Sequence, residues 1–162
     1  MSRAFVKESD QAGVTPLPDR PISPDRNPVT RRGLLLIESR LAEFEGELAR
    51  AVAAGDRDGV GRASRELRYW TARRATAEVA APSPEGDRVV FGVAVAVWRD
   101  DGTRTTFRIV GEDEADPAVG RIAWTAPVAR ALLGGGVGDL RELPTGKVEI
   151  VSIDPVPEAP EE

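Results

Sequence analysis

The chain has 162 residues, of which 41% are hydrophobic and 30% are charged, and this length suits one ordinary domain or two small ones. It contains no Cys and no His, which excludes thiolate nucleophiles, disulfides, the usual zinc sites and His-based acid–base catalysis. Residues 1–82 hold 14 basic and 12 acidic side chains, and residues 83–162 hold 8 and 15, so neither half has the basic face of a general nucleic-acid binder. No apolar run is long enough to span a membrane and the first residues lack a signal-peptide core, so we expect a soluble, cytoplasmic monomer.

Residues 1–28 form a leader rich in proline and polar residues. Proline lacks a backbone donor and fixes φ, so this density of prolines excludes a helix and disfavours a strand. We therefore predict an extended or disordered leader. Its prolines are Pro16, Pro18, Pro21, Pro24 and Pro28.

Residues 29–79 carry two heptad patterns, each with apolar side chains at alternating steps of three and four, which is typical of a coiled coil. Thr30 precedes the first pattern and is expected to cap a helix that runs to Ala54. The members of this first seam are Leu34, Ile37, Leu41, Phe44, Leu48 and Ala51.

A short turn, Gly55–Gly59, separates the two patterns; glycine supplies the left-handed position and Asp58 can cap the next helix. The second seam consists of Val60, Ala63, Leu67, Trp70, Arg74 and Ala77. Two seams joined by so short a turn fold back as an antiparallel pair, because neither helix is stable alone in water. Arg74 is the one charged seam residue, and we expect it to extend past the end of the pair or to meet an acid such as Glu38.

A linker with prolines and glycine, residues 80–88, precedes a segment of different character at 89–154. Strands are predicted over 89–98 and 103–110 around an Asp-Gly turn, with a short strand near 121–124 and further strands to 153. Thr125 is expected to cap a short helix that has Pro127 in its first turn. Residues 155–162 are predicted to form an acidic, disordered tail. The fold class is therefore α+β, with a helical hairpin before an antiparallel β domain with one short helix.

The tip of the hairpin holds the first candidate site, Asp56 and Asp58. Two carboxylates at the end of a rod could coordinate a divalent cation that another protein's active site holds. Capping of the second helix is the simpler interpretation, because Asp is preferred at helix starts.

Two charged clusters complete the list of candidates. The acids of residues 112–116, which include Asp113, Glu114 and Asp116, lack the glycine and the ligand spacing of a calcium loop and indicate a solvated loop or a docking patch for a basic partner. The arginines of the second helix indicate a solvated coiled-coil face, with nucleic acid or an acidic protein as the alternative ligand. These arginines are Arg57, Arg62, Arg65, Arg68, Arg73 and Arg74.

Several motifs in order strongly resemble the C-terminal domain of Gre-type transcription elongation factors (GreA/GreB). The matching stretches are Val90–Gly92, Ile109–Asp116, Ala126–Gly134 and Val137–Asp139. In the leader, Ser2–Glu8 and Pro18–Pro24 look like the start of GreB-like members. The resemblance spans most of residues 29–153.

This resemblance implies an FKBP-like C-terminal domain that docks on the rim of the secondary channel of bacterial RNA polymerase, while the coiled coil enters the channel. Acids at the tip then help the polymerase to hold a catalytic Mg²⁺ and to cleave its own backtracked RNA. On this view the chain is not itself an enzyme, has no cofactor of its own, and meets nucleic acid only inside the transcription complex. The matching residues expected to dock are Asp113, Glu114, Asp116, Pro127 and Arg130.

Two departures from the family pattern bear on cleavage. Asp56 falls on the first tip acid of the family's Gly-Asp-x-x-Glu pattern, but Gly59 occupies the position of the Glu, and Asp58 is one residue early. Both arms of the hairpin look shorter by about a heptad, which withdraws the tip by roughly 10 Å. We therefore expect channel binding with weak or absent cleavage, as in Gre-fold regulators of the Rnk type. A cleavage-competent factor, an FKBP-like peptidyl-prolyl isomerase or chaperone, and a coiled-coil adaptor outside transcription are the alternatives.

Overall fold

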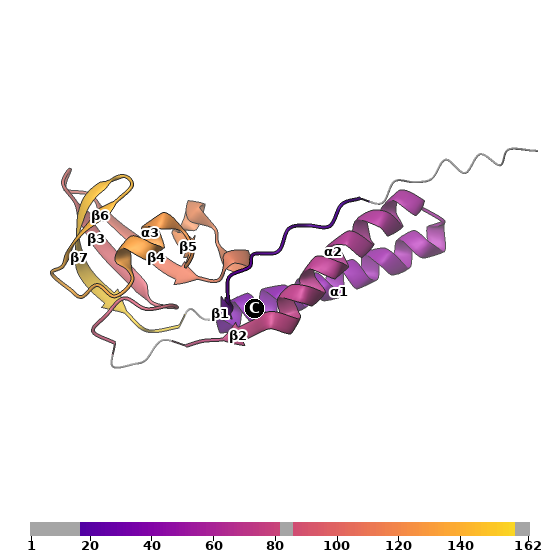
Figure 1. Cartoon of the computed structure of the whole chain (residues 1–162), viewed down its shortest axis with the longest axis horizontal. Helices are drawn as coiled ribbons and strands as arrows, with labels where there is room; N and C mark the ends of the chain where they lie inside the picture. Colours follow the sequence, from indigo (N-terminus) through magenta and orange to yellow (C-terminus); the bar gives the residue numbers. More distant parts are fainter. Residues whose placement is uncertain (1–16, 82–85, 158–162) are drawn as a thin grey trace, which may run out of the picture.

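The computed structural model describes residues 17–81 and 86–157, and the structural statements below concern these residues. The first part of the predicted leader, part of the linker and the end of the predicted tail lie outside them. Figure 1 shows two parts, a long helical hairpin and a small sheet domain, with the hairpin projecting away from the sheet.

The hairpin consists of α1 (Arg31–Ala54) and α2 (Arg57–Thr76). Thr30 caps α1 as predicted, since its hydroxyl accepts from the backbone N–H of Gly33 at 2.9 Å. Gly55 ends α1 in the left-handed conformation, with φ of 67°. The cap of α2 is Asp56 rather than the expected Asp58, which lies in the first turn of the helix.

Both predicted seams face each other along the hairpin. Ile37, Ala51, Ala63 and Trp70 are buried, and the other apolar seam residues are half-buried. Arg74 is exposed and its Nε lies 3.0 Å from Glu38 Oε1, which is the partner that the sequence indicated. Pairing of the helices buries the apolar stripe that each would otherwise expose.

A two-stranded parallel sheet, which the sequence did not indicate, joins the ends of the hairpin. Strand β1 (Asn27–Val29) pairs with β2 (Ala77–Val79), so the leader ends in a strand although it contains Pro28. Each strand has only three residues, too few to show an alternating pattern in the sequence. Val29 from β1 packs with Ile37 and Trp70, which extends the hairpin core to its base.

The globular domain is one sheet of five strands in the order β5-β4-β3-β7-β6. The predicted strand at 89–98 is regular only from Ala94, although Val89 and Val93 are buried in the core. The sheet is antiparallel as predicted except for one strand pair, β4 with β5, which is parallel. The elements of this domain are β3 (Ala94–Arg99), β4 (Arg104–Val110), β5 (Arg121–Ala123), α3 (Pro127–Leu132), β6 (Leu140–Leu143) and β7 (Gly146–Asp154), with short 3₁₀ turns at Glu112–Glu114 and Pro117–Val119.

Val, Ile and Leu side chains from β3, β4, β7 and α3 form the core of this domain. The α+β class is therefore confirmed: a helical hairpin precedes a sheet domain that carries one short α-helix. No helix among the described residues is long and apolar enough to cross a lipid bilayer.

Candidate functional site

The tip of the hairpin presents two exposed carboxylates, Asp56 and Asp58. Asp56 is held in place because its Oδ1 accepts from the backbone N–H of Gly59 at 2.9 Å. Its Oδ2 lies 3.7 Å from the Arg62 guanidinium. One oxygen of Asp56 is therefore used as the helix cap, and the other faces a cation of the same chain.

Gly59, where the sequence resemblance places the second tip acid, is tightly packed against this cap. A Cβ at Gly59 would lie 2.3 Å from Asp56 Oδ2, so a Glu there requires the Asp56 side chain to rotate. Among residues 17–81 and 86–157, no three His, Cys, Asp or Glu side chains converge in a way that could hold a metal ion. The tip thus offers two carboxylates at most, from Asp56 and Asp58.

The acidic loop, residues 112–116, lies where the globular domain meets the base of the hairpin. Asp113 and Glu114 face the hairpin there, and we call their contacts with α1 and α2 the joint. The Tyr69 hydroxyl donates to Asp113 Oδ1 at 2.5 Å, and Arg73 Nε donates to Asp113 Oδ2. The Asp113 side chain is only 8% exposed. Asp113 therefore joins the globular domain to α2.

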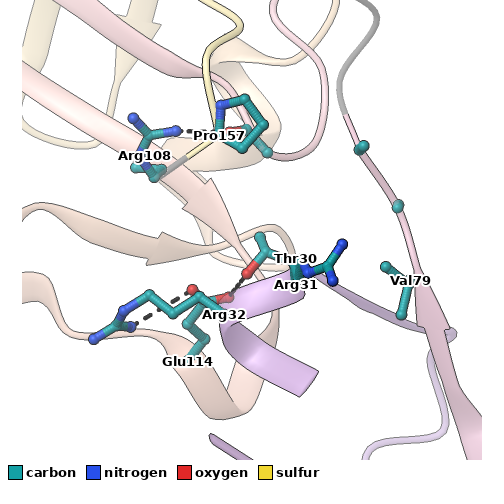
Figure 2. A pocket seen from close by; sticks show the side chains of 10 residues that line it. Thr30, Arg31, Arg32, Val79, Arg108, Glu114 and Pro157 are labelled. Carbon is teal, nitrogen blue, oxygen red and sulfur yellow. Dashed lines mark hydrogen bonds and ion pairs between the residues drawn. The ribbon is translucent and has the colours of Figure 1, made fainter. Parts of the chain in front are cut away.

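Glu114 makes the second connection, to the start of α1. Its side chain is 2% exposed, accepts from Thr30 Oγ1 at 2.5 Å and lies 3.6 Å from Arg32. Figure 2 shows Thr30 and Arg32 pointing toward this carboxylate beside a pocket at the joint. A Cβ at Gly33 would lie 2.7 Å from Glu114 Oε2, so the carboxylate sits where an anion would bind at the N-terminus of α1.

Arg73 is the residue that the sequence interpretation missed. The sequence predicts a solvated side chain for Arg73, like those of the other arginines of α2, but the Arg73 side chain is only 2% exposed. Its guanidinium pairs with Asp113 and Glu112 and donates to Asn27 Oδ1 at 2.7 Å. A buried charge requires such partners, and here they come from the leader and the acidic loop.

Tyr69 is a weaker acid than an ordinary tyrosine in this joint. Burial raises the pKa of Tyr69 to about 12, and the hydrogen bond to Asp113 contributes in the same direction. The neutral hydroxyl is the form that can donate to the carboxylate, so both effects favour the bonded state.

Asp116, Pro127 and Arg130 are exposed, unlike the other two residues expected to dock. Asp116 caps the second 3₁₀ turn through Ala118 N, and Pro127 and Arg130 lie on α3. Thr125 does not cap α3 as predicted, because its hydroxyl donates to Glu112 Oε1 at 3.2 Å instead. The assignment of all five residues to partner binding stays a prediction.

These features describe an α+β protein whose helical hairpin projects from a small sheet domain and is fixed to it by buried ion pairs and hydrogen bonds. Residues 83–155 match the family model of the C-terminal domain of the transcription elongation factors GreA and GreB. The chain is 32% identical over 149 residues to GreA of Desulfovibrio desulfuricans, which covers 78% of this chain and 92% of that protein. It therefore belongs to the GreA/GreB family of transcription elongation factors.

The chain is also similar to other proteins. GreA of Methylobacterium sp. is 35% identical, with 80% of this chain and 97% of that protein covered. GreB of Neisseria meningitidis serogroup B is 38% identical, but the match spans 56% of this chain and 59% of that protein. Among solved structures, the GreA factor homolog Gfh1 of Thermus thermophilus has 22% identity and a TM-score of 0.39, covering 80% of this chain and 99% of that chain.

Proposed function

We propose that this chain binds bacterial RNA polymerase in the cytoplasm, anchors its globular domain at the rim of the secondary channel and inserts α1 and α2 into the channel. It modulates elongation and supplies no catalytic centre of its own. Family membership supports the partner, and the projecting hairpin supports the mode of entry. The Mg²⁺ involved in any cleavage is held by the polymerase.

The state of the tip supports weak or absent stimulation of RNA cleavage. Asp56 uses one oxygen for the cap of α2 and has Arg62 beside the other, so a metal ion must compete with this guanidinium. Glycine stands at the second acid position of the family pattern. The arms have 24 and 20 residues. The sequence resemblance predicts that each arm is about a heptad shorter than in typical cleavage factors, which withdraws the tip by roughly 10 Å. Metal coordination tolerates errors of only a few tenths of an ångström, so a withdrawn tip cannot complete the site.

The test separates binding from cleavage. The chain is incubated with core polymerase for affinity measurement, and then with a stalled, backtracked complex whose RNA is followed over time. The chosen variant is Asp56→Ser, because serine retains the helix cap and removes the carboxylate. We expect binding by both proteins and cleavage no faster than without factor. Robust cleavage that disappears in Asp56→Ser would show that the tip reaches the catalytic centre.

A prolyl-isomerase function has less support from the structure. Catalysis of that kind uses an apolar pocket lined by aromatic side chains, whereas Phe91, Phe107 and Trp124 pack against the core of the globular domain. Phe91 and Trp124 do line a pocket, but its other walls include the charged Arg26 and Glu78 at the base of the hairpin. An isomerase assay with a proline-containing peptide checks this alternative directly.

The exposed residues on the globular domain give a cleaner test of docking than the acidic loop. Reversing the charge of Asp113 or Glu114 would break the joint, so a loss of affinity would not identify a contact. Arg130→Glu and Asp116→Asn alter the charge of exposed side chains, and asparagine keeps an oxygen that can accept from Ala118 N at the 3₁₀ turn. We expect each to weaken polymerase binding with unchanged thermal stability, and Lys147→Glu, a charge reversal at an exposed position of β7 in the same domain, serves as the control. Unchanged affinity in both variants would assign docking to another surface.

A further inference from the structure

The described part of the leader lies along α2 rather than away from the protein (Figure 1). Arg65 Nε donates to the Pro18 carbonyl at 2.6 Å, and Arg68 Nε donates to Asp19 Oδ1 at 2.6 Å. Two of the arginines that the sequence left as a solvated face therefore hold a segment of the same chain.

Arg20 makes the most extensive contact of this segment. Its guanidinium pairs with Glu66 at 2.6 Å and lies with its central carbon 3.6 Å from the centroid of the Tyr69 ring. The same group is 5.5 Å from the centroid of the Trp70 ring. A guanidinium over an aromatic face is attracted by the ring quadrupole and covers the ring from water.

Tyr69 connects this contact to the joint. Its ring meets Trp70 edge-on at 5.1 Å, and Trp70 belongs to the hairpin core. Its hydroxyl donates to Asp113 of the globular domain. One side chain thus touches the leader, the hairpin core and the acidic loop.

The leader reaches the joint a second time at Asn27, where β1 begins. Asn27 is 3% exposed and its amide donates to the Arg73 carbonyl at 2.8 Å. Arg73 in turn donates to Asn27 Oδ1 and to Asp113. Tyr69 and Arg73, the two residues of α2 that bind Asp113, are therefore both in contact with the leader: Tyr69 through its ring and Arg73 through its guanidinium and its carbonyl.

We propose that residues 18–26 form a strap along α2, and that Arg20 is a positioning residue which, through Tyr69 and Asp113, sets the direction in which the hairpin projects from the globular domain. Without Arg20 the Tyr69 ring loses its cover and is free to turn from Asp113. The joint then relies on Arg73 and Glu114, and the hairpin samples a wider range of directions. This property belongs to the free protein and goes beyond the proposed function, since it does not depend on the polymerase.

The absence of Cys from the sequence makes a direct distance measurement possible. Spin labels are attached to Cys pairs introduced into the full chain at exposed positions. The strap pair is Ile22→Cys with Val52→Cys, and the joint pair is Val52→Cys with Leu140→Cys. Each pair is measured by pulsed electron resonance with Arg20, with Arg20→Ala, with Arg20→Lys and with the control Arg40→Ala, whose exposed partner is Glu43 on the same helix.

In Arg20→Ala we expect both distance distributions to broaden, with the population outside the main peak rising about fivefold for loss of a cation–π contact. Arg20→Lys should broaden both distributions less than Arg20→Ala does, because lysine keeps a cation over the ring. Arg40→Ala should change neither distribution. If only the strap pair broadens, Arg20 holds the leader on α2 but does not set the direction of the hairpin. If neither pair broadens, Arg20 does not hold the leader. Either result overturns the proposal. Circular dichroism confirms that each variant is folded. Glu66→Gln, which removes the charge that pairs with both Arg20 and Arg65, tests the attachment of the leader from the α2 side.

Discussion

Arg73 and Arg74 are neighbours on α2 with the same chemistry and opposite energetic roles. Arg74 forms an exposed pair with Glu38, and such pairs contribute at most about 1 kcal/mol. Arg73 is buried with Asp113, so its loss leaves a carboxylate without its cation. Removing one partner of a buried pair costs far more than the net worth of the pair, because the other charge cannot be solvated.

Arg73→Met, which keeps much of the side-chain volume, should therefore lower the free energy of unfolding by about 3–5 kcal/mol. Arg74→Met at the next position should change it by less than about 1 kcal/mol. Denaturant unfolding of the two variants in parallel measures the difference. Equal effects of the two substitutions would show that the Arg73 network contributes nothing beyond a surface pair.

Tyr69 is the only tyrosine in the chain, so the absorbance of tyrosinate reports its titration directly. Its pKa is about 12 in the folded protein, above the usual value near 10, so its contribution to stability is complete below about pH 10 and is lost as the pH rises through about 12. Asp113→Asn should lower this pKa toward 10 but not to it, because burial remains. Titration of the original protein near the ordinary value would contradict the bonded joint.

At the level of elements, the start of α2 combines a structural and a proposed functional role in Asp56. The cap satisfies a backbone N–H that the helix cannot bond itself. We expect Asp56→Ala to destabilise the chain by about 1 kcal/mol and Asp56→Ser to have little effect. Thermal unfolding distinguishes the two variants, and Asp58→Ala, outside the cap, is the control. A loss of stability in Asp56→Ser equal to that in Asp56→Ala would mean that the charge, rather than the cap, is what matters.

The elements that follow from local pattern were predictable. The two seams, the Thr30 cap, the left-handed Gly55 and the Arg74–Glu38 pair depend on residues close in sequence or on helix periodicity. The joint was not predictable, because it depends on contacts between the hairpin and the globular domain, and no periodic pattern in the sequence specifies how these two parts pack. Asp113 and Glu114 looked like a solvated patch since nothing near them in the sequence provides the Arg73 and Thr30 groups that bind them. Arg73 could have been suspected, since it lies three residues after the seam residue Trp70 and therefore near it on the surface of α2.

At the scale of the whole molecule, the buried joint fixes the direction in which the hairpin projects from the globular domain. Asp113 and Glu114 attach the globular domain to α2 and to α1, so both arms of the hairpin are fixed at their base. A partner that binds the globular domain therefore determines where the tip goes. Rigid attachment avoids the entropy that a free hairpin would lose on entering a narrow channel.

The most direct test of this account is a cross-link from the tip. A photoreactive residue at position 52, which is exposed on the last turns of α1, is placed in the full chain bound to RNA polymerase, and the same group at position 140 on the globular domain is the reference. We predict that position 52 cross-links to residues inside the secondary channel while position 140 does not. Cross-links from position 52 to the outer surface alone, with binding intact, would contradict a hairpin that enters the channel.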